Sequence, residues 1–253
     1  MPDRVLWPDY ITEREKALAA LREEASERFA TASTPEKRRT AYRLLMAAQN
    51  AAALSVPQLD DGNVRLCDLR ALLDELLGAA FILAGGAGVT LRVSLPQAPV
   101  FAEIQPDLYI LGVVNLLCYA VPRVKGETAC CFEERNGYAV LGFRHGATSP
   151  AGDFYTRAAR HIAALHHGKA AISLPERLRP ATGPTSGPAC FSMMEIPICP
   201  QAKYSDASPF HPPTAAEYIT DRFSPVAVGL WGLLPGYFTA REKNFKAKKR
   251  FLQ

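Results

Sequence analysis

The sequence lacks several features that would assign it to a large class of proteins. No apolar run approaches the roughly 20 residues that cross a bilayer. The N-terminus has no basic start followed by an apolar stretch, and the six cysteines include no Cys-x-x-Cys pair. These absences argue against a membrane-spanning protein, a secreted protein and a zinc-binding module. We therefore expect a cytoplasmic protein with reduced, mostly buried thiols and no metal site.

The composition is that of a folded protein. The chain has 253 residues, of which 48% are hydrophobic and 21% are charged, so it is long enough for one large domain or two small ones. The net charge is +4, and much of it comes from the last fifteen residues. A charge of this size without a recognised binding motif argues against nucleic acid as a partner.

Residues 12–55 carry apolar side chains at the spacing of two helices. Thr12 and Glu15 form a capping-box pattern that is expected to start the first helix. Thr34 is expected to cap the second, with Pro35 at the favoured first position. The short turn between them predicts an antiparallel helical hairpin. Because its faces are rich in alanine and only thinly apolar, we expect it to form a homodimer through residues 12–55.

Residues 63–199 mix helical and strand periodicity. The expected elements are a strand at 63–66, a helix at 68–84, strands at 89–95 and 100–104, a helix at 107–121, a hairpin of strands at 127–133 and 138–143 around Asn136-Gly137, a helix at 154–166, and strands at 169–173 and 190–198. Strands and helices segregated in this way predict an α+β fold, a two-layer sandwich. The expected organisation is a helical hairpin at 1–62, this domain at 63–199 and a tail at 200–253.

The helix at 107–121 carries the segment Asn115-Leu-Leu-Cys-Tyr119-Ala, which resembles the Asn-Leu-x-x-Asn-Ala box of histidine-kinase-type ATPases. Three other segments follow the order of that family: Asp68-Leu-Arg-Ala-Leu-Leu-Asp-Glu-Leu, Ile162-Ala-Ala-Leu-His-His-Gly-Lys and Ala189-Cys-Phe-Ser-Met-Met-Glu-Ile-Pro. Over roughly residues 64–198 the chain is therefore similar to the GHKL superfamily. The resemblance implies the histidine-kinase ATPase fold, preceded by a dimerisation-type helical hairpin.

The positions that match the family's nucleotide site have changed. In the family, the second asparagine of the box holds the magnesium ion that bridges the ATP phosphates, and here that position is Tyr119. Aligned on Gly146, the aspartate that bonds adenine is replaced by Arg144, which offers only donors. Asp153 puts a negative charge where a glycine box cradles phosphate. Asn115 and the aligned Gly146 are retained, so the resemblance implies a vestigial site at Asn115, Tyr119, Arg144, Gly146 and Asp153.

These changes predict a protein without catalytic residues, for which neither ATP nor Mg²⁺ is an expected cofactor. The chain also has no histidine before His145, so its hairpin lacks a phosphoacceptor. The resemblance then implies a non-catalytic, pseudokinase-like scaffold or regulator of bacterial two-component signalling, with a sensor kinase or a response regulator as partner. The alternative is a divergent ATP-binding kinase subunit, for which ATP and Mg²⁺ would be the cofactors.

Residues 200–253 lie beyond the resemblance. They read as a Pro-rich linker, a short helix at 215–223, an apolar stretch at 225–235 and a basic end. Two interpretations stay open. In one, the apolar stretch packs on the domain and the basic end is solvated. In the other, residues 225–251 dock on an anionic membrane surface and make the protein a peripheral adaptor.

Overall fold

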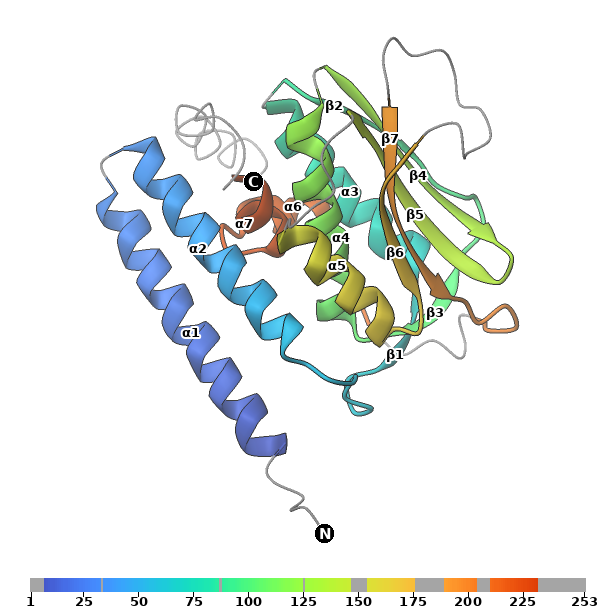
Figure 1. Cartoon of the computed structure of the whole chain (residues 1–253), viewed down its shortest axis with the longest axis horizontal. Helices are drawn as coiled ribbons and strands as arrows, with labels where there is room; N and C mark the ends of the chain where they lie inside the picture. The colour runs from blue at the N-terminus through green and yellow to red at the C-terminus, as the bar shows by residue number, and fades with distance from the viewer. Residues whose placement is uncertain are drawn as a thin grey trace, which may run out of the picture.

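The computed structural model describes residues 7–32, 34–86, 88–124, 126–146, 154–175, 189–203 and 210–231 (Figure 1). The chain begins with an antiparallel pair of long helices, α1 (Trp7–Thr31) and α2 (Pro35–Leu54). Thr34 caps α2 as expected, with its hydroxyl accepting the Lys37 N–H at 3.3 Å. The prediction that Thr12 starts the first helix is wrong. The helix already includes Pro8, which a first helical turn tolerates because the N–H groups there have no intrahelical partner.

The rest of the described chain follows the predicted order of elements with shifts of a few residues at most boundaries. These elements are β1 (Arg65–Asp68), α3 (Leu69–Gly86), β2 (Thr90–Ser94), β3 (Phe101–Ile104), α4 (Pro106–Ala120), the 3₁₀ turn η1 (Val121–Arg123), β4 (Glu127–Arg135), β5 (Tyr138–Gly146), α5 (Phe154–Leu165), β6 (Lys169–Pro175), β7 (Ala189–Pro197), α6 (Ala215–Thr220) and α7 (Pro225–Trp231).

Five of the strands form one mixed sheet in the order β2-β4-β5-β7-β6, and β1 pairs with β3 in a separate antiparallel ribbon. β2 runs parallel to β4, whereas the other neighbours in the sheet are antiparallel. The β4–β5 hairpin turns at Asn136 and Gly137, whose φ angles of 53° and 80° explain the choice of residues. The sequence-predicted hairpin is therefore confirmed.

The helices lie in successive layers on one side of the sheet (Figure 1). α3, α4 and α5 lie next to the sheet, and α2, α6 and α7 lie on the outside of these three helices. α1 is outermost and contacts α2. The α+β fold is confirmed, with the hairpin and the C-terminal helices adding to the sandwich of sheet and helices.

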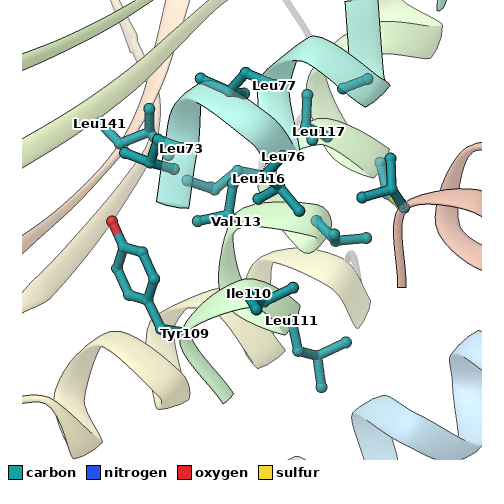
Figure 2. Packing of buried hydrophobic residues seen from close by; sticks show 14 of the residues in the cluster. Leu73, Leu76, Leu77, Tyr109, Ile110, Leu111, Val113, Leu116, Leu117 and Leu141 are labelled. Atoms are coloured by element: carbon teal, nitrogen blue, oxygen red, sulfur yellow. The ribbon is translucent and has the colours of Figure 1, made fainter. Parts of the chain in front are cut away.

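The core lies between α3, α4 and the sheet. Figure 2 shows Leu73, Leu76 and Leu77 of α3 beside Leu116 of α4 and Leu141 of β5, all of them 1% exposed or less. Full burial of one such side chain contributes about 1.5–3 kcal/mol to stability. α4 is therefore held firmly in place, and with it every residue of the motif that it carries.

The C-terminal helices belong to the same core. Thr214 and Glu217 form a complete capping box at the start of α6. In α7 the side chains of Val226, Val228 and Leu230 are 0% exposed and lie in the main hydrophobic cluster. The apolar stretch therefore packs on the domain over its described part, while residues 232–253 lie outside the described residues. None of the described helices has both the length and the apolar character that crossing a membrane requires.

Candidate functional site

α4 is the helix that carries the predicted motif, and it is covered on all sides. It begins at Pro106, and Pro122 in the following turn prevents it from continuing as a regular helix. Every residue of α4 except Asp107 is buried. A helix that is apolar around most of its circumference needs neighbours on every side. Here α5, α7 and the sheet contact α4, α3 lies beside it (Figure 2), and Asn50 of α2 bonds to it.

Asn115 is fully buried, and its side-chain amide is hydrogen-bonded to Asn50 of the hairpin. Its Nδ2 donates to Oδ1 of Asn50 at 2.8 Å, and Nδ2 of Asn50 donates back to Oδ1 of Asn115 at 2.6 Å. The second Nδ2 hydrogen of Asn115 goes to the Leu111 carbonyl at 2.8 Å. Both asparagines are 0% exposed. The retained motif residue thus uses both of its donors, and its oxygen accepts one bond, within the protein itself.

Tyr119, one helical turn further along α4, is also 0% exposed. Its ring meets the His145 ring edge-on, with a centroid distance of 5.2 Å and an interplanar angle of 87°. The guanidinium carbon of Arg123 lies 4.0 Å from the centroid of the same ring, in cation–π geometry. Nη1 of Arg123 also donates to the Tyr119 carbonyl at 2.6 Å. The phenol is therefore packed between a histidine and an arginine.

His145 completes this cluster from β5. Its Nδ1 lies 2.7 Å from the Gly146 carbonyl and its Nε2 lies 2.8 Å from Oγ of Ser192 on β7. A neutral ring with the proton on Nδ1 satisfies both contacts, because Nδ1–H donates to the carbonyl and Nε2 accepts the serine hydroxyl. Burial lowers the pKa of His145, and the charge of Arg123 lowers it further, against the opposing effect of the Gly146 carbonyl.

The serine–histidine pair has the geometry of a nucleophile and its base, but its place in the fold favours a structural role. Ser192 is 0% exposed and His145 is 3% exposed. A nucleophile must reach its substrate, and a hydroxyl with no exposed surface does not. The pair therefore satisfies two buried polar groups where β5 meets β7.

The other predicted site positions do not join this cluster. Successive side chains of a strand point to opposite faces, so Arg144 lies on the sheet face away from His145 and Tyr119. The Arg144 carbonyl accepts the hydroxyl of Thr128 on β4. At Gly146 a Cβ atom would lie 2.9 Å from the Arg123 carbonyl, so the strand passes close to η1 there. Asp153 lies outside the described residues.

A second buried histidine lies at the end of α5. Nε2 of His166 accepts the Gln105 N–H at 3.1 Å, and its Nδ1 lies 2.8 Å from the Ile162 carbonyl. Both ring nitrogens are satisfied when the ring is neutral. Burial lowers the pKa of His166, and the nearby His167 lowers it further, against the two backbone contacts that raise it. His166 joins α5 to the start of α4 and has a structural role.

The described part of the chain has no cluster of side chains suited to metal binding or thiol chemistry. No group of three or more His, Cys, Asp or Glu side chains there could hold a metal ion. None of the six cysteines, all of which lie in the described part of the chain, forms a disulfide. Cys67, Cys118 and Cys130 are buried, and burial raises the pKa of Cys67 to about 11, so that thiol stays protonated near neutral pH.

Sequence reasoning missed two residues of this region, Asn50 and His145. Asn50 follows Tyr42 and Met46 on one face of α2, so a polar residue within an apolar stripe was the available signal. The resemblance, aligned on Gly146, places Arg144 at the position that binds adenine and assigns no role to its neighbour His145. Only the register of β5 in the sheet shows which of the two faces α4.

No protein-family model and no curated protein sequence matches the chain. Several similar solved structures are of histidine kinases. Full-length ShkA in complex with AMPPNP has a TM-score of 0.53 at 14% identity, over 81% of this chain and 48% of that chain. The Acinetobacter baumannii histidine kinase AdeS has a TM-score of 0.47 at 10% identity, over 74% of this chain and 96% of that chain. The cytoplasmic segment of the histidine kinase QseC has a TM-score of 0.44 at 21% identity, over 60% of this chain and 91% of that chain.

At these identities the likeness concerns the fold alone. The chain spans about half the length of ShkA. The α+β fold of this chain is similar to that of ShkA, and other similar structures are of histidine kinases. The chain therefore has a histidine-kinase-like structure.

Proposed function

We propose that this protein is a histidine-kinase-like regulator that acts by binding other proteins and does not transfer phosphate. The proposal rests on the contacts of the two motif residues, Asn115 and Tyr119. Asn115 is bound to Asn50 in the interior, and the Tyr119 ring is packed between His145 and Arg123. In a kinase site these two positions would face the nucleotide and its metal.

The chemistry of this cluster is unfavourable for a magnesium ion. Mg²⁺ takes carboxylate, carbonyl or water oxygens in tight octahedral geometry. Two of the described neighbours of the Tyr119 ring are the imidazole of His145 and the guanidinium of Arg123. The positive charge of Arg123 would also repel a divalent cation in a site of low dielectric constant. A degenerate nucleotide site at Asn115, Tyr119, Arg144, Gly146 and Asp153 is therefore the simplest account of these positions.

Calorimetry with Mg-ATP tests this proposal. We expect no binding heat from the wild-type protein or from Tyr119→Asn, because the single change leaves Asn115 bound to Asn50 and Arg123 in place. Mg-AMPPNP serves as the non-hydrolysable control. Micromolar affinity of the wild-type protein for either nucleotide would contradict the proposal.

The second candidate is a divergent ATP-binding kinase subunit that phosphorylates a histidine of another protein. The observation in its favour is the likeness in fold to ShkA, whose structure is a complex with AMPPNP. Incubation with labelled ATP and a panel of histidine-containing bacterial signalling proteins separates the two candidates. Label on any of these proteins, lost after mild acid treatment, would support the kinase.

The partners belong to the same proposal: a second copy through residues 12–55, and a sensor kinase or a response regulator. Leu44 on α2 is 48% exposed, which leaves an apolar point on the hairpin for a partner. In sedimentation experiments we expect Leu44→Asp to shift a dimer toward monomer. Phe81→Asp is the matched control, because Phe81 is also 48% exposed but lies on α3. Equal behaviour of the two variants would argue against a dimer through the hairpin.

A membrane-surface role through residues 225–251 does not form part of the proposal. The described part of that stretch is α7, seven of its 27 residues, and the side chains of Val226, Val228 and Leu230 there are buried in the interior of the protein. Apolar anchors that are already buried contribute nothing to insertion between lipids.

A further inference from the structure

The C-terminal helices α6 and α7 contact both the hairpin and the domain (Figure 1). α7 contacts α2, α3 and α4, and α6 contacts α3. We propose that α6 and α7 form an intramolecular clasp that holds the hairpin docked over α4. This inference does not depend on whether the protein binds nucleotide.

The clasp fits the domain closely at a glycine. A Cβ atom on Gly229 of α7 would lie 2.6 Å from Cγ1 of Val114 and 2.7 Å from Sγ of Cys118, both on α4. Neither atom is the end of a long, adaptable side chain, so only glycine lets the two helices approach this far. At the other end of the clasp, the Ala215 N–H donates to Oε2 of Glu75 on α3 at 2.6 Å.

The same two helices also hold the hairpin. The ring of Trp231 at the end of α7 meets the ring of Tyr42 on α2 edge-on at 5.4 Å. Nη2 of Arg222, in the link between α6 and α7, donates to Oγ of Ser26 on α1 at 3.2 Å. One short segment thus reaches both helices of the hairpin and both α3 and α4 of the domain.

Contacts without the clasp also bind the hairpin to the domain, because α2 packs on α5. They include the Asn50–Asn115 pair and a contact of 2.7 Å between Nε2 of His161 on α5 and the Val56 carbonyl at the end of α2. Polar pairs of this kind give little net stability, although they fix the geometry. The apolar surface that keeps α2 in place therefore includes α7, and its loss would uncover the face of α4 that carries Asn115.

Hydrogen exchange measured by mass spectrometry on the full chain tests the clasp. The variant is Gly229→Ala, whose methyl group forces α7 away from α4. The control is Gly85→Ala near the end of α3, where an added Cβ meets no atom within 4 Å. In Gly229→Ala we expect exchange in α7, and in α2 from Tyr42 to Ala53, to rise about tenfold or more, with β5 and β7 unchanged. The control is expected to match the wild-type protein.

Trp231→Ala is the second variant, because it removes the contact with the hairpin and leaves the contact with α4. It is expected to raise exchange in α2 in the same way, with a smaller effect on the rest of α7. The clasp is ruled out if α2 keeps its wild-type protection while α7 loses it. It is equally ruled out if α2, α7 and the sheet change together in both variants, or if neither variant changes α2.

Discussion

The side-chain amides of Asn50 and Asn115 exchange two hydrogen bonds at a point where both residues are fully buried. Replacing one asparagine removes both of these hydrogen bonds and leaves polar atoms of the other amide buried without a replacement partner. We therefore expect Asn115→Ala and Asn50→Ala each to lower the free energy of unfolding by about 1–3 kcal/mol, measured by urea denaturation at a fixed protein concentration.

Two controls separate this pair from a generic loss of asparagine. Asn63 bonds Asp60 at the surface, at 2.7 Å, so Asn63→Ala is expected to cost less than about 0.5 kcal/mol. The double variant Asn50→Ala/Asn115→Ala should cost less than the sum of the single changes, with a coupling of about 0.5–3 kcal/mol. Additive losses would show that the two amides act independently.

Tyr119 is expected to behave as a core residue of the folded protein. Tyr119→Ala removes a fully buried ring from between His145 and Arg123 and leaves a cavity, so unfolding should become easier by about 3–5 kcal/mol. Tyr138→Ala, at a half-buried position of β5, is the control and should cost clearly less. A small effect of Tyr119→Ala in thermal or urea unfolding would mean that the ring faces an accommodating, solvent-filled space.

Stability should fall in mildly acidic solution. His145 and His166 both have a pKa below the ordinary value of 6.5, so below about pH 6.5 the unfolded chain binds more protons than the folded chain. The free energy of unfolding then decreases as pH falls, by up to about 1.4 kcal/mol per pH unit for each group. The loss is complete once the pH lies below the pKa values of the folded state, and none of it remains above pH 6.5.

Substitution identifies the histidines that are responsible. His166→Gln removes the titrating ring and should flatten the pH dependence below about pH 6.5, even though it lowers stability at neutral pH. His211, an exposed residue, supplies the control variant His211→Gln, which should keep the wild-type slope. Identical slopes in all three proteins would assign the acid sensitivity to other groups.

The turn before β6 requires a glycine at position 168. A Cβ atom on Gly168 would lie 1.9 Å from the Glu195 carbonyl oxygen, a backbone atom that has little room to move. We expect Gly168→Ala to destabilise the protein by about 1–3 kcal/mol or more through overpacking. Gly85→Ala, with open space around it, should change stability by less than about 1 kcal/mol, and in the stabilising direction. Thermal unfolding of the two variants gives the comparison.

The elements could be predicted wherever a local signal sets them. Asn136-Gly137 set a turn because both residues accept a positive φ, and Thr34 with Pro35 set the start of α2. The start of α1 could not be placed as well. The capping-box pattern at Thr12 is equally compatible with a helix interior, and the actual start at Trp7 carries a weaker signal.

The candidate site was harder to predict because its contacts are distant in sequence. That Asn115 is buried was not evident from α4 alone, since its mate Asn50 lies on the hairpin. The hairpin's apolar face suggested a second copy of the chain, yet Tyr42, Leu45 and Met46 are buried within the same chain, in a helix that contacts α5 and α7. The spacing of apolar residues shows that one face of a helix is covered. It does not show whether another part of the same chain or a second chain covers it.

The contact between Tyr42 and Trp231 joins two points that are separated by most of the chain. Synthesis proceeds from the N-terminus, so the hairpin is complete long before α7 exists. Until α7 emerges from the ribosome, the apolar face of α2 has no α7 to cover it and is open to other proteins in the cell. The docking of α7 on α2 therefore follows the formation of the hairpin, and the nascent protein passes through a stage in which its hairpin is available for contacts that the finished molecule no longer makes.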